Sequence, residues 1–143
     1  MINEYIKSVC QILKIKEPSI SYDASNFNTD TMMAQCAFDG STIFLKKIDK
    51  PNFDYAFSIA HELRHVWQIR SDFESYFSNY KPVDQCSSVE EYNLQPAEVD
   101  ANAFAAIVLT DFFHLKPLWN GLPDTVITAI NSRISTITRS QGL

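Results

Sequence analysis

The stretch PNFDYAFSIAHELRHVWQIR, residues 51–70, predicts one long helix. Its apolar side chains recur at the spacing of a single helical face, which is typical of a helix that packs beneath a sheet. They are Phe57, Ala60, Leu63 and Trp67, widened by Ile59, Val66 and Ile69. His61 and His65 border this stripe, so we expect one flank of the helix to face a cleft, and we interpret Arg64 as an exposed pairing residue.

His61, Glu62 and His65 have the spacing His-Glu-x-x-His. Residues four apart lie one above the other on a helix, so both imidazoles can be directed at a single ion. This arrangement is typical of a zinc site in which Glu62 acts as the general base, taking a proton from a water made acidic by the metal. The pattern therefore predicts a Zn²⁺-dependent hydrolase of peptide bonds, with Glu62 catalytic and His61 and His65 as ligands.

A third protein ligand is required, because a catalytic zinc site usually has three together with one open position. Glu98 is the first candidate, since it lies in an otherwise apolar segment where an unpaired charge would be costly to bury. Asp100 is the alternative, and the helical repeat turns it about 200° from Glu98, so only one of the two can face the metal. Asn102, four residues after Glu98, could orient that carboxylate or hydrogen-bond a ligating histidine.

Two other hypotheses remain open. In the first, the chain is a catalytically silent binding module that keeps the metal and acts by holding a protein partner. In the second, the histidines are a hydrogen-bonded pair on a half-buried helix of a metal-free structural domain, and both acids near residue 98 compensate the dipole of a helix N-terminus.

The first half of the chain predicts a helix and a small sheet. Apolar spacing predicts a helix from Asn3 to about Lys16, and residues 19–22 alternate weakly as a strand. Residues 33–38 and 42–47 are strand-like runs separated by Asp39-Gly40, which is a strong signal for a hairpin closed by a type I′ turn. We therefore expect a small antiparallel sheet packed on the helix that carries His61.

The second half predicts helices. Residues 71–95 are polar and too long for a simple turn, and we expect helical turns within them that could cover the cleft. Pro96 suits the first turn of a helix that continues from Ala97 to Leu109 and is apolar on nearly every side. A last helix is expected at residues 125–139. The fold class is α+β, and we expect residues 1–143 to form one zincin-like domain.

Composition narrows the context. A chain of 143 residues with 45% hydrophobic residues can bury a core without disulfides, and its three cysteines show no pairing pattern. Net charge is −5 and the basic residues are dispersed, which argues against direct nucleic-acid binding. No secretory signal or membrane-spanning stretch is visible, so we expect a cytoplasmic protein with no membrane contact. The oligomeric state is not indicated.

The residues His61-Glu-Leu-Arg-His65, followed by Glu98-Val-Asp-Ala-Asn-Ala-Phe-Ala105, resemble the ImmA/IrrE family of zinc metallopeptidases. The match covers roughly the segment from the hairpin to Leu109. It implies a gluzincin-like fold, zinc ligation by His61, His65 and Glu98, and Glu62 as the base. It also implies a protein substrate, typically a transcriptional repressor of a phage, a mobile element or a stress response. Residues 107–111 depart from the Leu-Met-Pro type ending of many relatives.

A peptidase also needs a hydrogen-bond donor for the developing oxyanion. Four residues have the right chemistry, and the sequence does not choose among them: Tyr76, Tyr80, Tyr92 and His114.

Overall fold

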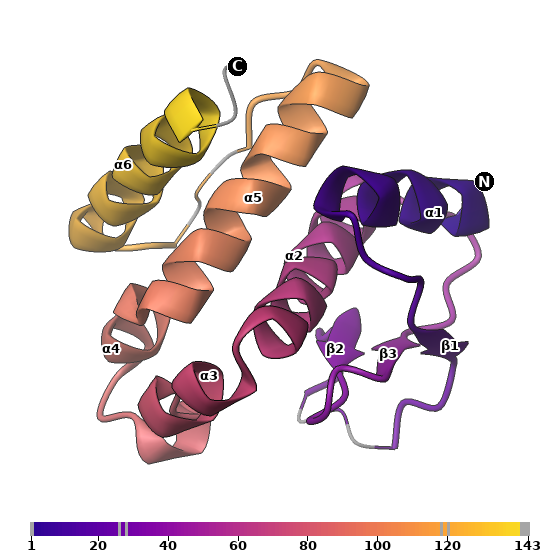
Figure 1. The fold of residues 1–143 in the computed structure, drawn as a ribbon, viewed down its shortest axis with the longest axis horizontal. Helices are drawn as coiled ribbons and strands as arrows, with labels where there is room; N and C mark the ends of the chain where they lie inside the picture. The colour runs from indigo at the N-terminus through magenta and orange to yellow at the C-terminus, as the bar shows by residue number, and fades with distance from the viewer. Residues whose placement is uncertain (1, 26, 28, 118, 120, 141–143) are drawn as a thin grey trace. The chain divides into compact units, whose positions relative to one another are not determined.

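A computed structural model describes residues 2–25, 27, 29–117, 119 and 121–140. The chain divides into two compact units, residues 1–72 and residues 73–143. The first combines helices with a three-stranded sheet and the second contains helices, so the α+β class is confirmed (Figure 1). Among the described residues, no helix is long and apolar enough to cross a membrane.

The first unit contains two helices and the sheet. Its elements are α1 (Ile2–Leu13), β1 (Ser19–Ser21), β2 (Ala34–Cys36), β3 (Thr42–Leu45) and α2 (Phe53–Ser71). Helix α2 packs against β2, β3 and α1. The predicted packing of this helix on a small sheet is therefore confirmed.

The sheet is mixed, with the order β1-β3-β2. Strands β2 and β3 pair antiparallel, as the hairpin predicts, but β1 runs parallel to β3. The expectation of a wholly antiparallel sheet is wrong. Strand β2 occupies one edge of β3 through the hairpin, so β1 joins the other edge, with Ser19 opposite Thr42. A three-residue strand carries no sequence signal for its direction.

The hairpin turn differs from the predicted type. A type I′ turn needs positive φ at both central residues, whereas Gly40 has φ +72° and Asp39 is not in that region. The turn is closed by the Gly40 N–H donating to the Ala37 carbonyl at 3.0 Å. A Cβ at position 40 would lie 3.1 Å from Cγ2 of Ile69. Glycine at position 40 therefore allows both the positive φ of the turn and the close approach of Ile69 on α2.

Side-chain hydrogen bonds hold the frame around α2. Asn52 caps its N-terminus by accepting from the Tyr55 N–H at 2.9 Å. The Tyr55 hydroxyl donates to the Lys46 carbonyl at 2.8 Å, just beyond β3. At the other end, Arg70 Nη2 donates to the Gly40 carbonyl at 3.1 Å. Both ends of α2 are thus tied to the sheet, and the middle turns, which carry the histidines, are fixed between them.

Helix α1 ends earlier than the predicted Lys16. Lys14 has φ +57°, and the Ile15 N–H donates back to the Cys10 carbonyl at 3.0 Å. A left-handed residue followed by a hydrogen bond from an N–H to the carbonyl five residues earlier is a Schellman motif, which ends a helix. The apolar face of α1 is buried as expected, and its buried residues are Ile6, Val9, Cys10 and Leu13.

The second unit is helical. Its elements are α3 (Phe73–Asn79), a short 3₁₀ helix η1 (Val83–Gln85), α4 (Val89–Leu94), α5 (Pro96–Phe113) and α6 (Asp124–Ser140). Helices α5 and α6 pack side by side around an apolar cluster containing Ala103, Val126, Ile130 and Ile137 (Figure 1). The helical turns expected within residues 71–95 are present as α3, η1 and α4, and both longer helices are confirmed.

Candidate metal centre

His61 and His65 converge on the surface of α2. Their Nε2 atoms are 3.1 Å apart and the ring centroids 4.7 Å apart, with the rings nearly perpendicular. Two imidazoles bound tetrahedrally to one zinc at the usual bond length would have nitrogens roughly 3.3 Å apart. The pair is therefore close to the geometry of two ligands of one ion. The same distance also suits a hydrogen bond from His61 to His65, which is the metal-free alternative.

Gln68 fixes the ring of His65 from the other side. Nδ1 of His65 lies 2.8 Å from Oε1 of Gln68, and that oxygen can only accept, so Nδ1 carries the proton. In the neutral ring the lone pair is then on Nε2, the atom that faces His61. His65 is 3% exposed, so this orientation is enforced by burial as well. The sequence analysis missed Gln68, although its position three residues after His65 on one helix face was a usable signal.

We expect Gln68→Ala to weaken zinc binding by roughly 10-fold, the lower end of the usual cost of losing a hydrogen-bond partner of a ligand. The ligating atoms remain, but the tautomer and orientation of His65 are no longer held. Zinc affinity measured by competition with a chromophoric chelator tests this. Gln11→Ala, at an exposed position of α1, is the matched control and should bind zinc as the unchanged chain does. Equal affinities in the two variants would exclude this role for Gln68.

Glu62 is a half-buried residue of α2. Its nearness to β2 is evident from Cys36, whose thiol pKa is raised, first by burial and second by the Glu62 carboxylate. The Cys36 thiol donates to the Ala37 carbonyl at 3.2 Å. The predicted base therefore lies on the same helix as the two histidines and is close enough to Cys36 of β2 to affect its pKa.

The position of Arg64 differs from the exposed one that the sequence predicts. It is 5% exposed, and its guanidinium carbon lies 3.9 Å from the centroid of the Trp67 ring. Arg64 is therefore buried and stacked on an aromatic face, and the prediction that it is exposed is wrong. Periodicity placed it on the polar side of the helix, but a guanidinium is weakly hydrated and packs well on an indole.

Glu98 lies in the first turn of α5 and is 2% exposed. Tyr80 donates its hydroxyl proton to Oε2 of Glu98 at 3.2 Å, and the Tyr80 and Tyr92 oxygens are 2.9 Å apart. The pKa of Tyr80 is strongly raised, mainly by burial and then by the Glu98 carboxylate. The cost of burying this carboxylate is thus offset in part by a hydrogen bond within the second unit.

Asp100 has a different partner. Its Oδ1 accepts from Nε of Arg133 on α6 at 2.8 Å, which joins α5 to α6. The Asp100 side chain is 9% exposed and that of Arg133 is 38% exposed. Asp100 is therefore compensated by a structural ion pair, whereas Glu98 accepts a hydrogen bond from the hydroxyl of Tyr80. Of the two carboxylates left open by the sequence, Glu98 is the better candidate ligand.

His61 and His65 offer two imidazole nitrogens and Glu98 offers a carboxylate, and these are donor types that could hold a metal ion. This is the donor set of several catalytic zinc sites.

The four candidate donors for the oxyanion lie in two different places within the second unit. His114 follows the last residue of α5 in a left-handed conformation, about 24 Å along the helix axis from Glu98. Tyr76, Tyr80 and Tyr92 instead form one aromatic group, in which the rings of Tyr76 and Tyr80 stack 4.9 Å apart. His114 is thus remote from the candidate ligand, and the tyrosines adjoin it.

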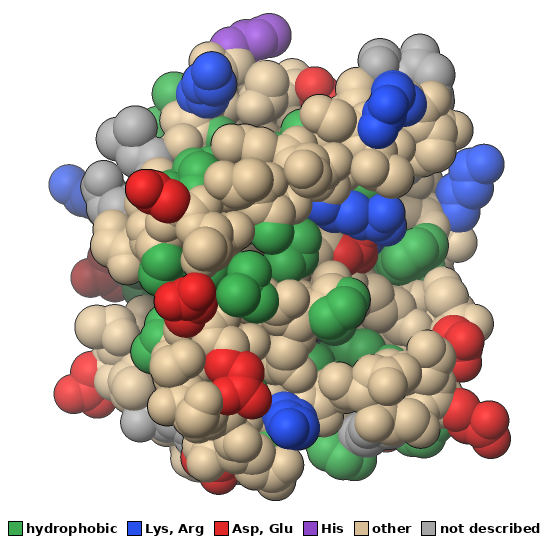
Figure 2. Space-filling view, turned by 90° about the vertical axis from the view of Figure 1, so that its left-hand side faces the viewer, with side chains coloured by type: hydrophobic (Ala, Val, Ile, Leu, Met, Phe, Trp, Pro, Cys, Tyr) green, Lys and Arg blue, Asp and Glu red, His purple; other side chains and the backbone are tan. Residues whose placement is uncertain are grey.

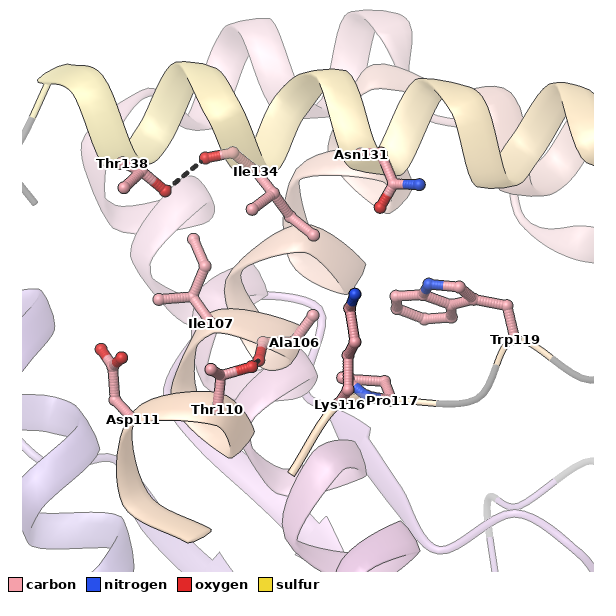
Figure 3. A pocket seen from close by; sticks show the side chains of 10 residues that line it. All are labelled: Ala106, Ile107, Thr110, Asp111, Lys116, Pro117, Trp119, Asn131, Ile134 and Thr138. Atoms are coloured by element: carbon pink, nitrogen blue, oxygen red, sulfur yellow. Dashed lines mark hydrogen bonds between the residues drawn. The ribbon is translucent and has the colours of Figure 1, made fainter. Parts of the chain in front are cut away.

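A cavity of about 580 Å³ lies between α5 and α6 (Figure 3). Ile107 and Ile134 form apolar walls, and Lys116 projects beside the ring of Trp119. None of the predicted site residues lines it. The face of the molecule displayed in Figure 2 carries acidic and basic side chains interspersed with apolar ones, and Lys and Arg do not gather there into one continuous patch.

Comparison with protein-family models, curated proteins and solved structures gives no match to this chain.

Proposed function

We propose that this chain is a zinc-dependent peptidase with His61, His65 and Glu98 as metal ligands and Glu62 as general base. The observation that carries the proposal is the approach of the two Nε2 atoms to 3.1 Å, with the outer nitrogen of His65 held by Gln68. The contact with Gln68 leaves the lone pair of His65 on Nε2, which is the form of the ring that a metal ligand needs.

The residues have distinct roles in the proposed reaction. Bound zinc would polarise the scissile carbonyl and make water more acidic. His61 and His65 supply neutral nitrogen donors, and the Glu98 carboxylate supplies the negative charge that favours a divalent cation. Glu62 accepts a proton from the attacking water and delivers it to the leaving amine, as a base on the same helix as two ligands can. Both transfers use one carboxylate, so its position beside the histidines is essential.

The resemblance to ImmA/IrrE peptidases supports a protein substrate. We infer that it is a transcriptional repressor of a phage or mobile element, cleaved to release transcription. The net charge of −5 fits a chain that contacts the repressor and not its DNA. A cytoplasmic location follows from that substrate.

Cleavage is tested by incubating the zinc-loaded chain with helix-turn-helix repressors, beginning with those encoded beside its own gene. We expect discrete fragments by mass spectrometry, and none after the metal is removed with 1,10-phenanthroline, because the chelator takes the ion on which water activation depends. Restoring zinc should restore cutting. A stable complex with an uncut repressor would instead support the binding module, in which the same metal-bearing surface holds its partner.

A further inference from the structure

We propose that Tyr80 is a positioning residue for the metal ligand Glu98, held in place by Tyr92 and by a backbone clamp from Gln95. This inference rests on the proposed function, because it takes Glu98 as a ligand. It gives Tyr80 and Tyr92 a role that differs from the oxyanion donation for which the sequence made them candidates.

The hydrogen-bond directions follow from the chemistry of the groups. An ionised carboxylate only accepts, so the contact of 3.2 Å between Tyr80 and Oε2 of Glu98 uses the single hydroxyl proton of Tyr80. The oxygen of Tyr80 is then an acceptor toward Tyr92, 2.9 Å away. The proton between the two phenols therefore belongs to Tyr92. The result is a directed chain from Tyr92 through Tyr80 to Glu98, in which each hydrogen bond polarises the next.

Tyr80 is fixed from the side of the backbone as well. The side-chain amide of Gln95 accepts from the Lys81 N–H at 2.7 Å and donates to the Lys81 carbonyl at 2.8 Å. Gln95 is the residue immediately before α5, three positions ahead of Glu98. This two-point clamp ties the residue after Tyr80 directly to the start of the helix that carries the ligand. Stacking on Tyr76 at 4.9 Å restrains the phenol ring.

The expected effect is pre-organisation of the carboxylate. A glutamate side chain has several rotamers, and ordering it when the metal binds costs conformational entropy. Tyr80 imposes one orientation beforehand by holding Oε2, and the other oxygen then serves the metal. Its proton is committed to Glu98, so Tyr80 acts through the ligand and not on the substrate. Hydrogen-bond partners of metal ligands typically contribute 10–100-fold to affinity, and we expect Tyr80 to be in that range.

The test compares Zn²⁺ affinity, by chelator competition, in Tyr80→Phe, Tyr92→Phe and Tyr22→Phe. Each variant removes one phenol oxygen, and Tyr22 is an exposed residue of the first unit that serves as the matched control. We expect roughly 10–100-fold weaker binding for Tyr80→Phe, a smaller loss for Tyr92→Phe and none for Tyr22→Phe. The visible absorption of the Co²⁺-substituted chain, which reports ligand geometry, should change in Tyr80→Phe alone or most strongly.

Glu98→Ala, measured alongside, separates the two claims. If Glu98→Ala loses zinc while Tyr80→Phe keeps the affinity and the Co²⁺ spectrum of the unchanged chain, the positioning role is wrong and the ligand assignment stands. If Glu98→Ala binds zinc normally, the ligand assignment itself is wrong and the inference fails with it. Should circular dichroism show that Tyr80→Phe does not fold, Tyr92→Phe decides, and an affinity equal to that of Tyr22→Phe would overturn the proposal.

Discussion

Glu62→Gln is expected to retain zinc and to lose hydrolysis by about 10²–10⁴-fold, the usual contribution of a positioned general base. The amide has nearly the shape of the carboxylate but cannot accept the proton of the attacking water. The three ligands are untouched, so the zinc content should equal that of the unchanged chain. The measurement is the rate of fragment formation at saturating repressor, with metal content determined on the same samples, and the loss should appear in kcat.

Glu74→Gln is the matched control, since it makes the same chemical change at an exposed position of α3. It should cleave at the unchanged rate. Turnover by Glu62→Gln within a few-fold of this control would exclude Glu62 as the base. A variant that loses both zinc and activity would instead show that Glu62 acts on the metal site and not on the water.

Glu98→Ala should bind zinc far more weakly than the unchanged chain, by more than the roughly 10–100-fold typical of losing a partner of a ligand. The substitution removes one of three donors and the only anionic one in the proposed set. Two histidines alone would leave the ion with too few protein ligands for a stable catalytic site. Competition titration with a chromophoric chelator measures the difference, and cleavage activity should fall with occupancy.

Asp100→Ala is the matched control on the same helix. It removes the ion pair with Arg133 and should lower the free energy of unfolding by about 1–3 kcal/mol, measured by urea denaturation. Its zinc affinity should stay close to that of the unchanged chain. The opposite pattern, with zinc lost in Asp100→Ala and kept in Glu98→Ala, would reverse the assignment of the third ligand.

The helices of this chain were largely predictable, because long periodic segments report their buried faces directly. The apolar stripe within residues 51–70 located α2 to within two residues at its start and one at its end. The sheet was harder to predict. The strands are three or four residues long, and the parallel pairing of β1 depends on which edge of β3 remains available after the hairpin forms. The turn type depended on the φ of Asp39, which is not positive as a type I′ turn requires.

The candidate site was predictable where one helix supplies it. The spacing of His61 and His65 is sufficient to bring their Nε2 atoms together, since both lie on α2. The residues that hold the candidate ligands in place were harder to predict from the sequence. Gln68 could have been found from its three-residue offset from His65. Tyr80 reaches Glu98 from a segment between two short helices, and in the sequence it was only one of four candidate donors for the oxyanion. Arg64 was wrongly placed because helical periodicity does not anticipate stacking on Trp67.

We expect this chain to hold one zinc ion, and elemental analysis of protein purified without added metal measures this. The expected result is about one zinc per chain, because a three-ligand site with high affinity would retain the ion. A chain that contains no metal, and that takes up none when zinc is added, would contradict it. In that case His61 and His65 would be a hydrogen-bonded pair in a structural domain.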